Sequence, residues 1–171
     1  MIKKHHEPCI LFLEAAFSES DGKRLKDAGY AGVERFADHF RDDKTKHTAQ
    51  GVKDPKIIKL CNSKGWLLVT TDSSMHKTHT ELIKRTQVTI LATAHNSAGN
   101  LEPWVKALIQ AKAKIERHFK KHERPWFATF TRQGEIHITT IGPDKVCRRT
   151  RPKEMEPSSA TATKRDTKRA S

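Results

Sequence analysis

The chain has 171 residues, of which 35% are hydrophobic and 31% are charged, and its formal net charge is +13. This length allows one ordinary domain with a real core, and no segment approaches the roughly 20 apolar residues of a membrane helix. The three cysteines are far apart, which argues against a disulfide framework or a zinc knuckle. We expect a cytoplasmic protein. The charge fits a polyanionic partner, and equally fits lysines that only keep the protein soluble.

The chain begins with an apolar run followed by a helical pattern. Residues 9–14, CILFLE, predict a buried strand that ends on a carboxylate. Residues 18–28 predict a helix, because serines and acids stand at its start and a glycine follows it. Residues 33–37 predict a short second strand, and residues 38–53 are polar and irregular.

The middle of the chain repeats the alternation of helix and strand. Asp54 and Pro55 predict a helix start, with Asp54 as the N-cap and Pro55 at the first helical position. The apolar run at residues 66–70 predicts a third strand. Residues 78–81, THTE, match a capping box and predict another helix start, and residues 88–92 predict a fourth strand.

The last part of the folded chain predicts one long helix and a hairpin. Asn100 is a good cap for a helix whose apolar stripe reaches Phe119. The segments WFATFT and EIHITTI are separated by a short turn and predict an antiparallel hairpin. Strands that alternate with helices favour an α/β fold with a mainly parallel sheet covered on both faces. We expect one domain over residues 1–142 and a basic, disordered tail over residues 143–171.

Carboxylates follow three of the predicted strands, at the edge where an open α/β sheet binds its ligands. Glu14 ends the first strand, Asp38 follows the second, and Asp72 follows the third. Asp54 can approach the same edge, although capping is the favoured interpretation for it alone. Oxygen ligands of this kind suit Mg²⁺ or Mn²⁺. Asp38 can equally be a loop acid and Asp72 a turn residue, but two acids on the apolar strand ends favour a metal site.

The segments ILFLEAAF, ADHF, KDPKIIKLCNSKGWLLVTTD and RPWFATFTRQGEIHI together resemble the PIN-like nuclease domain, and most closely its VapC-type toxin-like branch. The resemblance covers about residues 10–141. It implies a three-layer α/β/α fold and a Mg²⁺- or Mn²⁺-dependent ribonuclease that cleaves RNA with an acidic cluster. It also implies that the protein is a toxin with an antitoxin protein as partner. Whether the chain forms a homodimer is left open.

The resemblance assigns roles to the four acids. Glu14 matches the first acid of the family, which is usually Asp, and Asp72 matches the acid after the third strand. Asp38 and Asp54 match acidic positions that are less fixed. All four are the predicted catalytic residues, and Glu14, Asp72 and Asp38 are the predicted metal ligands. The segment after Asp72 lacks the further acid of the family, so the alternative is a catalytically inactive PIN-like module that binds RNA or a protein.

The residues predicted to contact RNA lie after the third strand and on the long helix. They are Ser74, His76, Lys77, Lys112, Lys120 and Lys121. The helix lysines can follow a phosphate backbone, or they can form an ordinary solvated face. His118 and His122, four residues apart, are more simply part of that charged face than metal ligands.

Overall fold

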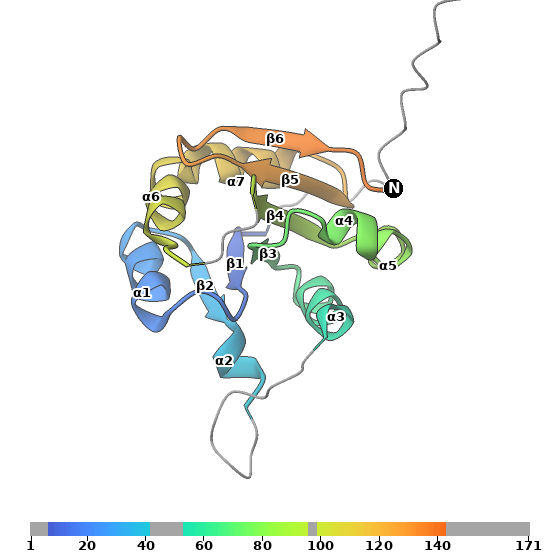
Figure 1. Ribbon diagram of the computed structural model, residues 1–171, viewed down its shortest axis with the longest axis horizontal. Coiled ribbons are helices and arrows are strands. Elements are labelled where there is room, and N and C mark those ends of the chain that lie inside the picture. The colour runs from blue at the N-terminus through green and yellow to red at the C-terminus, as the bar shows by residue number, and fades with distance from the viewer. Residues whose placement is uncertain (1–6, 42–52, 96–98, 143–171) are drawn as a thin grey trace, which may run out of the picture.

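A single six-stranded sheet forms the centre of the computed structural model, which describes residues 7–41, 53–95 and 99–142 (Figure 1). The strands are β1 (Ile10–Leu13), β2 (Gly32–Arg35), β3 (Leu67–Thr70), β4 (Thr89–Thr93), β5 (Trp126–Phe130) and β6 (Ile136–Thr139). They lie in the order β2-β1-β3-β4-β5-β6, and the first five are parallel. β6 pairs with β5 antiparallel. The predicted α/β fold and its C-terminal hairpin are therefore confirmed.

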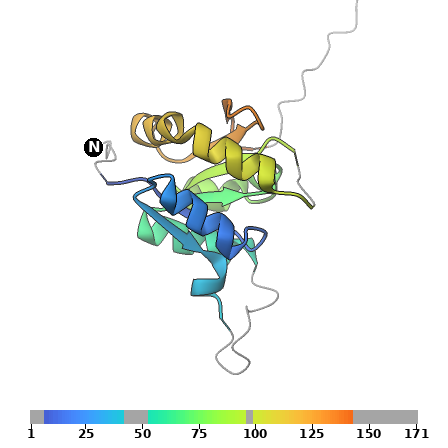
Figure 2. The ribbon, with the colours of Figure 1, turned by 90° about the vertical axis from the view of Figure 1, so that its left-hand side faces the viewer.

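Helices cover both faces of the sheet. They are α1 (Glu19–Asp27), α2 (Phe36–His39), α3 (Asp54–Lys64), α4 (Met75–Thr78), α5 (Thr80–Thr86), α6 (Glu102–Gln110) and α7 (Lys112–Lys121). One core lies under α1, α6 and α7, and a second lies under α2, α3, α4 and α5. Figure 2 shows α1 and α6 side by side in front of the sheet. The chain therefore forms three layers, with the sheet in the middle.

The central strands are apolar because both of their faces are covered. Successive side chains of a strand point to opposite faces. Leu11 and Leu13 accordingly join the core under α1, α6 and α7, while Phe12 joins the other core. Strands β3 and β4 are buried along their whole length. This pattern is typical of parallel strands with helices on both sides.

The second strand is shorter than its sequence predicts. β2 ends at Arg35, and Phe36 and Ala37 belong to the short helix α2. The ring of Phe36 is buried against the core under α3 and lies 4.8 Å from the ring of Phe40. The apolar residues that extend the strand pattern therefore fill the core from a helix, and the strand prediction was wrong for these two positions.

Neither predicted helix cap in the middle of the chain forms. Asp54 is the first residue of α3, and Lys53 occupies the N-cap without a side-chain bond. The Asp54 carboxylate instead accepts a hydrogen bond from His79. The capping box at residues 78–81 is absent because Thr78 ends α4, a helix that the sequence did not predict. A tertiary contact in one case and an extra turn of helix in the other replaced the local bonds.

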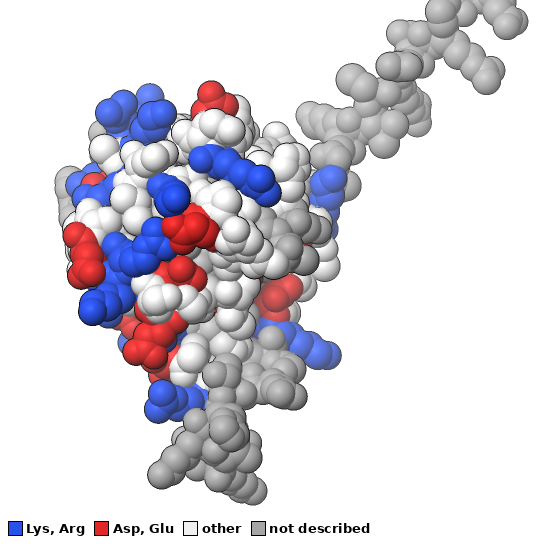
Figure 3. Space-filling view, turned by 60° about the vertical axis from the view of Figure 1, so that its left-hand side comes forward, with Lys and Arg blue, Asp and Glu red and all other residues white. Residues whose placement is uncertain are grey.

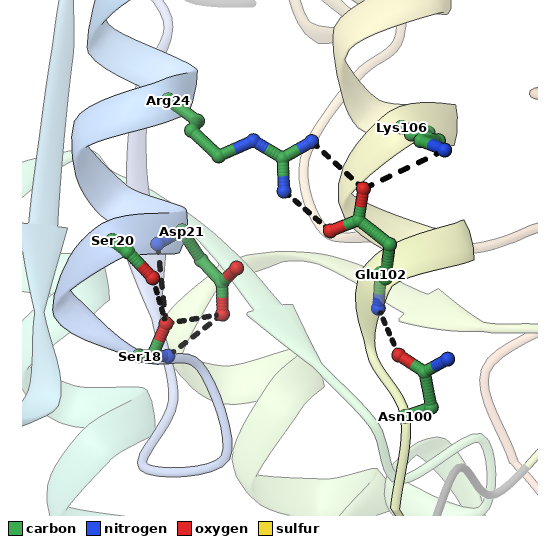
Figure 4. Close-up of polar contacts among 7 residues, drawn as sticks. All are labelled: Ser18, Ser20, Asp21, Arg24, Asn100, Glu102 and Lys106. Atoms are coloured by element: carbon green, nitrogen blue, oxygen red, sulfur yellow. Dashed lines mark hydrogen bonds and ion pairs between the residues drawn. The ribbon is translucent and has the colours of Figure 1, made fainter.

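The long predicted helix consists of two helices that meet at Ala111. The hairpin turn packs on this junction through Gly134, where an added Cβ would lie 3.2 Å from the Ala111 Cβ. Leu101, and not Asn100 as predicted, is the N-cap of α6, but the side-chain oxygen of Asn100 still accepts the N–H of Glu102, the first residue of the helix, at 3.0 Å (Figure 4). At the start of α1, Ser18 forms a capping box with Asp21.

The predicted tail at residues 143–171 lies outside the described residues. In the three described ranges, no helix is both long enough and apolar enough to cross a bilayer.

Candidate functional site

The carboxyl edge of the sheet, where the parallel strands end, positions Glu14 and Asp72. β1 and β3 are parallel neighbours, with Leu13 opposite Val69. Glu14 follows β1 directly, and its N–H donates to the Val69 carbonyl at 3.2 Å. Asp72 follows the end of β3 by two residues. Both acids therefore lie at the edge where ligands of open α/β sheets are bound.

The Glu14 carboxylate is held by two threonines of the neighbouring strand end. Thr70 donates its hydroxyl to Oε2 at 2.5 Å. Thr71 donates both its N–H, at 2.6 Å, and its hydroxyl, at 2.5 Å, to Oε1. A carboxylate has about four acceptor positions, so these three bonds leave room for one further ligand. The side chain is half-buried, and its orientation is fixed by the end of β3.

Asp72 is held by the turn that starts α4. Its Oδ1 accepts the Ser74 N–H at 2.8 Å and the Ser74 hydroxyl at 2.6 Å. An aspartate that bonds to the main chain two residues later is a normal turn device. Both of these bonds go to Oδ1, so the turn does not use Oδ2.

The hydroxyl of Thr70 connects the Glu14 carboxylate to the main chain at Asp72. It donates to Glu14 and accepts the main-chain N–H of Asp72 at 3.0 Å. Thr70 is fully buried, so neither bond is exchanged easily for a bond to water. Glu14, Thr70 and Asp72 thus form one hydrogen-bonded unit at the carboxyl edge.

Asp38 and Asp54 are engaged in pairs of their own. Asp38 forms a bidentate ion pair with Arg35, at 2.7 and 3.0 Å, and this bond raises the pKa of the guanidinium. Asp54 accepts from His79 Nε2 at 3.0 Å. Among the described residues, no group of three or more His, Cys, Asp or Glu side chains is arranged to hold a metal ion. The predicted four-acid cluster therefore reduces to Glu14 and Asp72.

Two carboxylates suit a metal ion that keeps several water ligands better than an ion whose ligands all come from the protein. Mg²⁺ loses its water reluctantly and is commonly bound through one or two carboxylates together with the phosphates of a substrate. Glu14 retains one acceptor position, and the turn leaves Oδ2 of Asp72 unused. The chemistry of this donor set suits Mg²⁺ or Mn²⁺, with water and phosphate completing the coordination.

The residues predicted to contact RNA do not share one surface. His76 is only 5% exposed, and its ring lies 4.6 Å from that of Phe127. It therefore packs in the interior and does not present its ring to a ligand. Ser74 and Lys77 are exposed near the carboxyl edge.

The three lysines of α7 lie on the other side of the sheet and toward its opposite edge. α7 covers the core that it shares with α1 and α6, whereas α4 covers the other core. Just after α7, Arg124 donates to the carbonyl of Gly65, which precedes β3. The helix therefore ends near the edge where the parallel strands begin. Lys112, at the start of the helix, has its Nζ 5.7 Å from the ring centre of Tyr30, which precedes β2, and it pairs with Glu116 at 2.9 Å. Lys112, Lys120 and Lys121 are thus separated from Glu14 and Asp72.

Two features of the site were not predicted from the sequence. The buried threonine in the run LLVTT is unusual within an aliphatic strand, and it could have indicated a partner for the nearby acid. The bond between Asp54 and His79 joins residues 25 positions apart and carries no local signal.

The buried cysteines offer no nucleophile. Burial raises the pKa of the Cys9 thiol to about 12 and also raises the pKa of the Cys61 thiol. Both groups therefore stay protonated at neutral pH, and a thiol is a poor nucleophile compared with a thiolate. Both are simply small core residues, as their apolar surroundings predict.

Comparison of the chain with models of known protein families, with curated proteins and with solved structures finds no match.

Proposed function

We propose that the protein is a metal-dependent endoribonuclease of the PIN-like type, with its active site at the carboxyl edge of the sheet. The unit of Glu14, Thr70 and Asp72 is the observation that carries this proposal. It brings two acidic residues to neighbouring strand ends, and in the hydrogen bonds among the described residues one acceptor position of Glu14 and Oδ2 of Asp72 are not used. A nuclease needs such hard oxygen ligands to bring a divalent ion to a phosphodiester.

Each residue of the unit has a separate task. Glu14 and Asp72 would hold Mg²⁺ or Mn²⁺, which when bound supplies a Lewis acid for the phosphate and for a water nucleophile. Thr70 and Thr71 orient Glu14 through three hydrogen bonds. Ser74 fixes Asp72 through Oδ1. These supporting bonds keep the carboxylates in place without a third acid.

The resemblance to VapC-type toxins supplies the proposed setting. The protein would act in the cytoplasm on RNA, and an antitoxin protein would block the carboxyl edge. The net charge of +13 is consistent with an RNA substrate, because a positive surface attracts polyanions. A homodimer is compatible with this setting.

The second candidate is a catalytically inactive PIN-like module that binds RNA or a protein. The pairing of Asp38 with Arg35 favours it, because this bond removes the third predicted metal ligand from the set. A site with fewer carboxylates binds a cation more weakly. The same edge would then contact a partner without chemistry.

Cleavage of single-stranded RNA separates the two candidates. Purified protein is incubated with an RNA pool in Mg²⁺, in Mn²⁺ and in chelator, beside Asp72→Asn and Asp38→Asn. The nuclease requires metal-dependent cleavage that Asp72→Asn abolishes. Asp38→Asn is the matched control, since that carboxylate is held by Arg35. A folded wild-type protein that cleaves with neither metal supports the inactive module, and cleavage that survives Asp72→Asn refutes the assigned site.

A further inference from the structure

A groove on the face covered by α3, α4 and α5 gathers basic side chains. It has a volume of about 500 Å³ and is open to solvent. Its lining includes Lys59 from α3, Lys77 from α4, and His79 and Arg85 at the start and near the end of α5. Glu81 is the single carboxylate among the described residues that line it. The groove therefore has a positive balance of charge.

Two basic side chains of the groove, Lys59 and Arg85, are exposed, and a third, His79, is rigidly placed. In the part of the chain that the structure describes, neither Lys59 nor Arg85 takes part in a salt bridge, and both are exposed. His79 is fixed differently, because its Nε2 donates to Asp54 at 3.0 Å. A carboxylate oxygen only accepts hydrogen bonds, so this contact fixes both the ring and its hydrogen.

In the opposite helical layer, α1 and α6 together carry four basic and four acidic side chains, whereas α7 carries five basic side chains and one acidic one. Figure 3 shows basic and acidic side chains interleaved on the side of α1 and α6. Arg24 and Lys106 both pair with Glu102 there (Figure 4). By contrast, helices α3, α4 and α5 carry six Lys and Arg side chains and two carboxylates. The six are Lys56, Lys59, Lys64, Lys77, Lys84 and Arg85, and the two are Asp54 and Glu81.

The groove begins close to the carboxyl edge. Asp72 accepts from Ser74, which is the N-cap of α4. α4 is four residues long, or about 6 Å at 1.5 Å per residue, and Lys77 on this helix lines the groove. One turn of helix therefore separates Asp72 from Lys77, the first basic side chain of the groove.

The described part of the chain also ends at this groove. An added Cβ on Gly142 would lie 3.7 Å from Cγ2 of Thr80, which is part of the lining. The sequence beyond it, residues 143–171, carries nine Lys and Arg and four acids. Like charges disfavour this segment as an occupant of the groove. A polyanion, in contrast, is attracted by the positive balance of charge in the groove.

We propose that this groove, lined by Lys59, Lys77, His79 and Arg85, binds the phosphate backbone of single-stranded RNA beside the cleavage site. This inference rests on the proposed nuclease function, which supplies RNA as the substrate. It adds the path that the RNA follows over the protein surface. RNA leaves the carboxyl edge along α4 and passes between α3 and α5. It does not follow α7, whose lysines lie across the sheet.

Binding without cleavage tests the groove separately from catalysis. The probe is a short fluorescein-labelled oligouridylate, and anisotropy is measured with the full chain in chelator over a range of salt concentrations. The test variant is Lys59→Gln/Arg85→Gln. The control is Lys23→Gln/Lys26→Gln, which removes the same charge from exposed positions of α1. Thermal unfolding shows that each variant is folded.

The expected loss follows from counterion release. Each phosphate contact to a single strand contributes about 0.7 to the slope of log K against log salt, so two lost contacts reduce the slope by about 1.4. At about 0.1 M salt this is roughly a 25-fold loss of affinity. The control variant should change affinity much less. Equal losses in both variants, or no loss in the test variant, would overturn the proposal.

Two further arms identify the ligand and separate the two proposals. Uridine monophosphate in excess should compete poorly, because the groove binds several phosphates of one strand; full competition by the mononucleotide would overturn the RNA assignment. Asp72→Asn should not weaken binding in chelator, because it removes a negative charge beside the path of the RNA. If metal-dependent cleavage occurs but RNA does not bind in the groove, only the groove proposal is refuted. If RNA binds in the groove but is not cleaved, only the nuclease proposal is refuted.

Discussion

Replacing Thr70 by valine tests whether its hydroxyl holds the carboxyl edge together. Valine has almost the same shape, so Thr70→Val removes the bond to Glu14 at 2.5 Å and the bond from the Asp72 N–H at 3.0 Å without opening a cavity. A hydrogen bond to a charged group contributes about 1.5–3 kcal/mol and a neutral one about 0.5–1.5 kcal/mol. Glu14 is half-buried and keeps two bonds to Thr71, which favours the lower values. We expect a loss of about 2–3 kcal/mol in the free energy of unfolding.

Urea unfolding measures this loss, and Thr89→Val is the matched control. The Thr89 hydroxyl is also buried, but among the described residues it has no hydrogen-bond partner. Removing an unsatisfied buried hydroxyl should be neutral or stabilise the protein by up to about 1 kcal/mol. With a urea dependence of about 2 kcal/mol per M, Thr70→Val should lower the midpoint by about 1 M. Equal midpoints for the two variants would refute the role of the Thr70 hydroxyl.

Three further predictions concern other parts of the fold. Tyr30→Phe removes a buried 2.7 Å bond to a main-chain carbonyl of α6 and should destabilise the protein by about 1 kcal/mol in urea unfolding. Arg24→Met breaks the partly exposed pair with Glu102 and should cost less than about 1 kcal/mol, since exposed ion pairs contribute little; a loss comparable to that of Thr70→Val would contradict this. Burial is the largest cause, and the charge of His122 the second, of the lowering of the pKa of His118 below 6.5 in the folded protein. As pH falls, His118 is therefore protonated at a higher pH in the unfolded chain than in the folded one. The melting temperature should therefore drop as pH decreases below about 6.5, and His118→Gln should flatten that decrease.

The sheet could be predicted from the sequence because its signal is local. The run ILFL is apolar at every position and the run LLVT at all but its last, which is typical of strands covered on both faces. The placement of Glu14 and Asp72 at one edge follows from parallel pairing, so the sequence was sufficient for that as well. The Arg35–Asp38 pair is also local, at a spacing of three residues, and was overlooked.

The remaining features depend on contacts between distant segments. No pattern around Asp54 indicates that its carboxylate will accept a hydrogen bond from His79 and will not cap the helix. The burial of His76 depends on Phe127, which comes from a strand far along the chain. The separation of the α7 lysines from the carboxyl edge needed the strand order and the path of the helix. These properties arise from tertiary packing, which overrides local propensity.

The central claim is that Glu14 and Asp72 form the metal site, and Mn²⁺ binding tests it most directly. Electron paramagnetic resonance counts free Mn²⁺ during titration of the wild-type chain, of Glu14→Gln/Asp72→Asn and of the control Asp38→Asn/Asp54→Asn. The account predicts a bound ion in the wild type that persists in the control and is lost in the Glu14→Gln/Asp72→Asn variant. Binding that is unchanged in this variant, or lost only in the control, would contradict it.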